Sequence, residues 1–83
     1  HFLCHGEMRG MTLKDCRQGE RARVAGVHTS EALGARLRAL GLFCGAEVSV
    51  LRVSPRRRVW LVETAFSTFA LGAEIAESVE VTA

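Results

Sequence analysis

Four side chains near the N-terminus are of types that bind divalent metal ions. Together they place imidazole, thiol and carboxylate groups close in sequence, and they are His1, Cys4, His5 and Glu7. Zn and Fe(II) accept such donors, although the spacing matches no standard zinc finger. One interpretation is therefore a metal site in this segment.

Two further interpretations of the same segment stay open. A metal held there could bridge a homodimer by recruiting His28 or a carboxylate from a second copy of the chain. Alternatively, Phe2 and Leu3 could pack against the rest of the chain without any metal. The sequence thus requires no cofactor and leaves Zn or Fe(II) as an option at the N-terminal extension.

Arginines gather around a predicted hairpin turn that contains Pro55. Arg56 and Arg57 lie in the turn, with Arg52 and Arg58 on either side. Small barrels that bind oligonucleotides interleave basic residues with exposed rings for base stacking, and here Trp60 alone could serve. A formal net charge of +2 is also small for such a protein. The pattern argues against nucleic acid and favours a solvated hairpin tip or an acidic protein partner.

The sequence contains no pattern typical of an enzyme. The cysteines and histidines show no local arrangement of nucleophile, base and orienting group. Cys16 precedes a predicted strand and is interpreted as a small buried apolar residue. No GxxxxGK[ST] loop is present, so nucleotide binding by that route is excluded. We expect a protein that is not an enzyme.

The stretch from Leu33 to Val50 joins a predicted helix to a predicted strand. Leu33, Leu37 and Leu40 occur at i, i+4 and i+7, which places them on one helical face. Gly41 follows directly and can adopt the left-handed conformation that ends a helix. Leu42 should then fold back over Leu37.

Alternating apolar and polar residues predict five short strands around this helix. The expected strands cover 21–27, 46–53, 58–64, 68–71 and 79–81, with a helix at 31–40 and a helical turn at 72–77. Tight turns between so many short strands favour a closed sheet, because closure protects the edges. The predicted fold class is mainly β, a small five-stranded barrel with one short α-helix between strands one and two.

The chain is predicted to form one domain preceded by an extension. Residues 1–10 differ in character from the rest and are interpreted as an N-terminal extension, native or added, while residues 11–83 form the domain. No apolar run approaches the roughly 18 residues of a membrane span, and no signal sequence opens the chain. We expect a cytoplasmic protein that does not insert into a membrane.

Three segments resemble the ferrous iron transport protein A (FeoA) family, small bacterial proteins with an SH3-like barrel. These segments are LKDCRQGERARVAGV, RLRALGLFCGAEVSVLR and FALGAEIAESVEV, so the resemblance covers essentially Met11 to Val81. The middle segment is the most specific, because the family ends a leucine-rich helix with a Leu-Gly-Leu or Leu-Gly-Met step and a glycine turn. Here Leu40, Gly41, Leu42 and Gly45 match that pattern.

The resemblance implies an accessory protein of ferrous iron uptake. FeoA-like domains are thought to act on a large membrane ferrous iron permease through its cytoplasmic GTPase-bearing part. Related domains also form the C-terminal part of iron-dependent repressors, but no DNA-binding helix-turn-helix precedes this one. We therefore expect a regulator that works by protein contact.

The surface for that contact is expected beside the helix and at the hairpin tip. SH3-like barrels receive partner segments between their loops, and the inserted helix adds a further surface. The residues predicted to contact the partner are Arg38, Leu42, Phe43, Arg56 and Arg57. For Leu42 the alternative is complete burial by the helix stop.

Overall fold

A computed structural model describes residues 11–82 of the chain. The candidate metal ligands His1, Cys4, His5 and Glu7 therefore lie outside the described residues. Within them the strands are β1 (Arg21–Val27), β2 (Glu47–Val53), β3 (Val59–Glu63), β4 (Thr68–Gly72) and β5 (Val79–Thr82), and the helices are η1 (Leu13–Asp15), α1 (Glu31–Ala39) and α2 (Ala73–Glu77).

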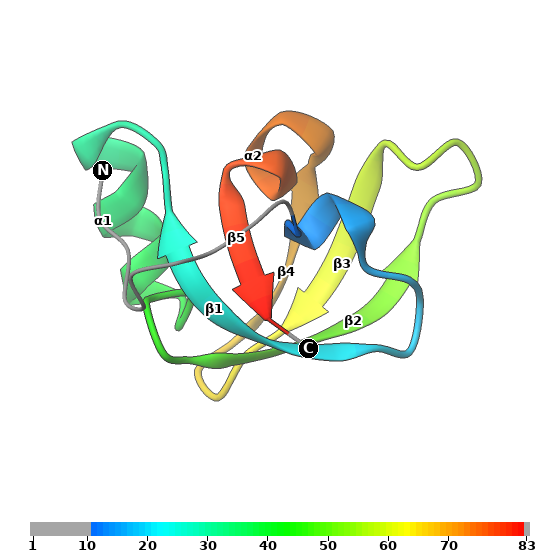
Figure 1. Cartoon of the computed structure of the whole chain (residues 1–83), viewed down its shortest axis with the longest axis horizontal. Coiled ribbons are helices and arrows are strands. Elements are labelled where there is room, and N and C mark those ends of the chain that lie inside the picture. Colours follow the sequence, from blue (N-terminus) through cyan, green and yellow to red (C-terminus); the bar gives the residue numbers. More distant parts are fainter. Residues whose placement is uncertain (1–10, 83) are drawn as a thin grey trace.

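The strands form one curved antiparallel sheet in the order β4-β3-β2-β1-β5 (Figure 1). Register irregularities occur in β1 between Val24 and Gly26 and in β2 between Val50 and Arg52. Such bulges bend a strand, which helps a short sheet to curl around its core. The helix α2 connects the two edge strands β4 and β5 and contacts both of them. The architecture is the predicted small β-barrel with one helix between β1 and β2.

The helix α1 begins and ends as its sequence predicts. The Ser30 hydroxyl accepts a hydrogen bond from the Leu33 amide at 3.2 Å and caps the N-terminus. At the other end Gly41 has a φ of 96°, and the Leu42 amide donates to the Leu37 carbonyl at 2.9 Å. The Gly41 amide donates to Arg38 at 3.0 Å, which completes a Schellman motif. Of the three leucines, Leu37 is buried while Leu33 and Leu40 are half-buried.

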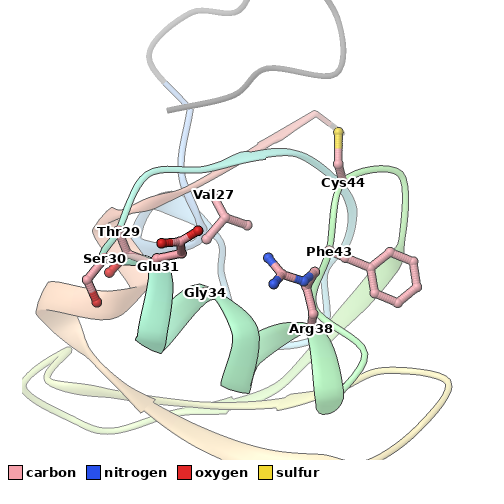
Figure 2. Close-up of a pocket in the computed structure, with 8 residues that line it drawn as sticks. All are labelled: Val27, Thr29, Ser30, Glu31, Gly34, Arg38, Phe43 and Cys44. Atoms are coloured by element: carbon pink, nitrogen blue, oxygen red, sulfur yellow. The ribbon is translucent and has the colours of Figure 1, made fainter.

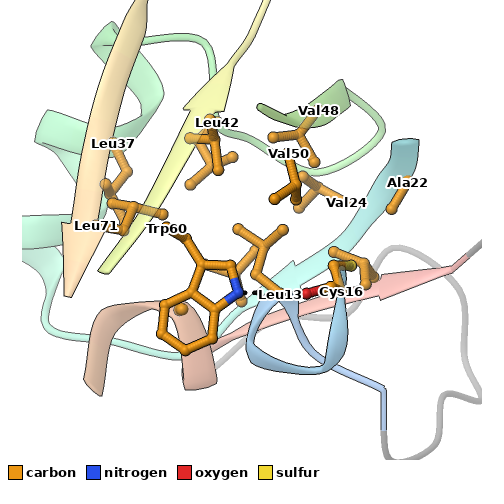
Figure 3. Packing of buried hydrophobic residues seen from close by; sticks show 14 residues of the cluster. Leu13, Cys16, Ala22, Val24, Leu37, Leu42, Val48, Val50, Trp60 and Leu71 are labelled. Atoms are coloured by element: carbon orange, nitrogen blue, oxygen red, sulfur yellow. Dashed lines mark hydrogen bonds between the residues drawn. The ribbon is translucent and has the colours of Figure 1, made fainter. Parts of the chain in front are cut away.

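The core is built from aliphatic side chains around one indole ring (Figure 3). Trp60 on β3 is fully buried, as are Val24, Val48 and Val62 from three strands. The indole Nε1–H donates to the Cys16 carbonyl at 3.4 Å, so its polar atom has a partner inside the core. The barrel interior is therefore filled by side chains.

The short helix η1 is a feature that the sequence analysis did not predict. The Thr12 hydroxyl accepts from the Lys14 amide at 3.2 Å, and Asp15 accepts from the Thr12 amide at 3.0 Å, which forms a capping box. Thr12 also bridges to Glu80, and the Val81 amide donates to the Met11 carbonyl at 3.0 Å. Residues 11–15 thus cover the outer edge of β5.

Cys16 should react with alkylating reagents far more slowly in the folded protein than in the unfolded chain. Burial raises the pKa of its thiol above the ordinary value of 9.0, and the nearby carboxylates Glu20 and Asp15 add to the shift. We expect alkylation by iodoacetamide, followed by mass spectrometry of the Cys16 peptide, to be at least about tenfold slower without urea than with it. Equal rates would show that the thiol is accessible.

The same pKa shift makes stability depend on alkaline pH. The folded state holds the proton more tightly, so the stabilisation is complete below the ordinary thiol pKa and is lost as the pH rises through the higher folded value. Substitution of Cys16 by serine should remove this contribution to the fall in the free energy of unfolding at alkaline pH.

Candidate partner-binding surface

An open hollow lies between α1 and the loop that follows it, and we call it the helix pocket (Figure 2). It has a volume of about 310 Å³ and is lined by Val27, Thr29, Ser30, Glu31, Gly34, Arg38, Phe43 and Cys44. Its position follows from local structure, because the Ser30 cap and the Gly41 stop fix both ends of the helix that forms one wall. The Cys44 Sγ atom lies 3.7 Å from the Ala25 carbonyl oxygen, so the loop after the helix stays close to β1.

Glycine at position 34 keeps the floor of the helix pocket open. Gly34 is buried on α1, and a Cβ added there would lie 3.8 Å from Arg38 Nη1 and 3.8 Å from Thr29 Cγ2. Figure 2 shows the Arg38 guanidinium and the Glu31 carboxylate directed toward each other over this glycine. The pocket thus offers apolar walls with one positive and one negative group at its rim.

The structure brings together two of the residues predicted to contact a partner. Arg38 is exposed and Phe43 is half-buried, and both line the helix pocket. Leu42 does not belong with them, because its side chain is 0% exposed and lies in the core. The expectation that Leu42 contacts a partner is therefore corrected: the Schellman motif folds it inward over Leu37.

The two predicted arginines of the hairpin lie away from the helix pocket. Arg56 and Arg57 occupy the turn between β2 and β3, at the opposite end of the view from α1 (Figure 1). Arg57 has a φ of 54°, and its Nη2 donates to the Lys14 carbonyl at 2.6 Å. Its guanidinium also lies 5.5 Å from the centroid of the Trp60 ring. Arg57 therefore joins the hairpin to η1, while Arg56 remains an exposed residue of the turn.

A second hollow adjoins the helix pocket at Phe43, and sequence reasoning missed it. It has a volume of about 320 Å³ and lies beside the β3–β4 turn. Phe66 in that turn is 65% exposed. The only sequence signal for this surface was an aromatic residue inside a turn of small residues.

Residues 11–82 contain no cluster of three or more His, Cys, Asp or Glu side chains that could hold a metal ion. Neither of its α-helices has the length and apolar character that crossing a membrane requires.

The protein-family model of the FeoA domain matches residues 11–83 of the chain. The chain belongs to the FeoA family. FeoA proteins are implicated in ferrous iron transport, and the match includes the curved sheet, α1 and its glycine stop.

Solved FeoA structures share this fold. The FeoA protein of Chlorobium tepidum is 32% identical, with a TM-score of 0.80 over 87% of this chain and 69% of its own. FeoA of Stenotrophomonas maltophilia, an SH3 domain protein solved with zinc, is 34% identical, with a TM-score of 0.73 over 87% of this chain and 89% of its own. The likeness to that structure confirms the predicted SH3-like class.

A manganese-dependent transcriptional repressor shares the fold at 20% identity, with a TM-score of 0.79 over 93% of this chain and 42% of its own. No curated protein matches the chain.

Proposed function

We propose that this FeoA-family chain is a non-catalytic accessory protein of bacterial ferrous iron uptake. In this proposal it acts in the cytoplasm by contact with the GTPase-bearing part of a membrane Fe(II) permease. Family membership supports the link to ferrous iron transport. The observation that carries the contact is the helix pocket, an open hollow beside a rigidly capped helix.

The helix pocket is suited to binding a protein segment because it combines an apolar surface with a small number of charged groups. Apolar atoms of Val27 and Phe43 provide contact area, and the rim groups Glu31 and Arg38 can fix the orientation of a bound segment. A charged residue at the edge of such a surface mainly affects association and register, while a charge that becomes buried affects affinity. The role of Arg38 can therefore be measured.

Charge reversal at Arg38 should weaken binding to the permease's cytoplasmic domain by roughly tenfold or more. The measurement is biolayer interferometry with the immobilised domain. Arg36→Glu is the matched control, because Arg36 is an exposed arginine of the same helix that does not line the pocket, and it should change binding less than about twofold.

Two outcomes would contradict the assignment to the helix pocket. Equal weakening by both variants would show that binding depends on the overall charge. Unchanged binding by Arg38→Glu would exclude the helix pocket as the contact surface. Arg56→Glu reports separately on the predicted hairpin contact, and unchanged binding would exclude that surface.

A further inference from the structure

The second hollow, which we call the turn groove, combines aromatic rings with carboxylates. Its lining residues are Gly41, Phe43, Ala46, Glu47, Ser49, Glu63, Thr64, Ala65 and Phe66. They come from the helix stop, the start of β2, the end of β3 and the β3–β4 turn. Two stretches of the chain, residues 41–49 and residues 63–66, thus meet at this groove.

Two phenylalanine rings form the apolar side of the turn groove. The centroids of Phe43 and Phe66 lie 6.0 Å apart with an interplanar angle of 56°. This is a favourable geometry for an aromatic pair. It leaves Phe66 65% exposed, the most exposed large apolar side chain among residues 11–82. The pair therefore presents ring surface that nothing in the described part of the chain covers.

The turn that carries Phe66 is held rigidly by one hydroxyl group. Thr64 Oγ1 donates to the Leu40 carbonyl at 2.6 Å and accepts from the amides of Phe66 at 3.2 Å and Ser67 at 3.3 Å. The Thr64 amide also donates to the Ser67 carbonyl at 2.8 Å. Because the turn is already ordered, a ligand that binds Phe66 has little conformational entropy to overcome.

Two carboxylates share the outward face of the sheet at this groove. Glu63 pairs with Ser49 in the register of β2 and β3, and Glu47 lies two residues before Ser49. The two glutamates are therefore diagonal cross-strand neighbours, with Cα atoms about 7–8 Å apart. Arg21 lies 3.8 Å from Glu47, and both side chains are more than half exposed, so that pair is weak. Glu63 forms no ion pair with any residue between 11 and 82.

We propose that the turn groove binds an arginine or lysine side chain of a partner protein, together with an apolar residue next to it in the partner's sequence. The cation lies between Glu47 and Glu63 and contacts the face of a phenylalanine ring, which combines ion pairing with a cation–π interaction. The neighbouring apolar residue covers the rest of Phe66. The two carboxylates would repel a nucleic acid phosphate or an acidic segment, so charge selects the occupant.

This inference deepens the proposed function, on which it rests for the partner being a protein, by giving the chemistry of a segment that the chain recognises. Its test does not use the permease, so the two proposals fail separately. The probe is a blocked peptide in which one arginine is flanked by leucines, and its counterpart carries glutamate in place of arginine. Amide chemical shifts of the 15N-labelled full chain are followed by NMR during titration.

The arginine probe should shift the amides of Glu47 and of residues 63–67 in a saturable way, with a dissociation constant on the order of 1 mM. Higher salt should weaken this binding. Glu63→Lys and Phe66→Ser should each weaken it at least about fivefold.

Two control variants make the same kinds of substitution at exposed positions outside the turn groove. Glu77→Lys changes the same charge on α2, and Leu51→Ser removes another exposed apolar side chain, 42% exposed on β2. Neither should alter binding. The proposal is wrong if the glutamate probe produces the same shifts, if the shifts map outside the turn groove, or if Glu63→Lys binds the arginine probe as well as the wild type does.

Discussion

Replacement of Gly41 by alanine is expected to lower the free energy of unfolding by about 3 kcal/mol or more. Gly41 has a φ of 96°, a backbone conformation that residues with a Cβ rarely adopt. A Cβ at this position would also overlap Thr64 Oγ1 and lie 2.9 Å from Thr64 Cβ and 3.2 Å from Phe66 Cβ. Because Thr64 is buried and holds the β3–β4 turn, it cannot move without losing its hydrogen bond to the Leu40 carbonyl.

Gly45→Ala separates the two contributions to this loss, which are the backbone strain at a positive φ and the steric overlap of the new Cβ with Thr64. Gly45 has nearly the same φ of 93°, but an added Cβ would meet nothing within 4 Å. Its substitution should therefore cost only the backbone strain, about 1–2 kcal/mol. The measurement is urea unfolding followed by circular dichroism, with both variants compared to the wild type. Equal losses in the two variants would show that the close approach of Gly41 to Thr64 contributes nothing.

The helix stop illustrates what could be predicted from the sequence. A left-handed glycine and an apolar residue after it form a local pattern, and local geometry alone sends Leu42 back over Leu37. The same pattern does not reveal that Gly41 lies against Thr64, because that contact joins residues from different elements. For Leu42 the sequence left two outcomes open, contact with a partner or burial by the helix stop, and the structure shows burial.

The strands were predicted well, and the turn groove was not. Alternating burial at the start of β2 follows from the alternating sequence Glu47–Val50, whereas β3 alternates in burial although Val59 to Val62 are all apolar. The diagonal placement of Glu47 and Glu63, however, depends on the register that aligns Ser49 with Glu63. Register is set by the whole sheet and its bulges, so the residues of the groove could not be grouped beforehand. The division at residue 10 and the metal ligands in residues 1–10 stay predictions.

Replacement of Trp60 by alanine should have the largest effect on stability, with a loss of about 3–5 kcal/mol. The ring is fully buried at the centre of the core, and its Nε1–H satisfies the Cys16 carbonyl. Arg57 covers one side of the ring and donates to the Lys14 carbonyl. The indole thus attaches residues 14–16 to the sheet as well as filling the barrel.

A loss of this size approaches the whole stability of a small domain, roughly 5 kcal/mol at the lower end of the usual range. Trp60→Ala should therefore be largely unfolded at 25 °C, as measured by far-UV circular dichroism, because the variant lacks the chain's single tryptophan for fluorescence. Trp60→Phe keeps an aromatic ring but removes the donor to Cys16, and it should cost about 1–2 kcal/mol. Arg57→Ala removes only the exposed cation and its bonds, so it should cost about 1 kcal/mol or less. A folded Trp60→Ala variant with wild-type stability would contradict the central role of the indole, because some other contact would then have to hold η1 against β3.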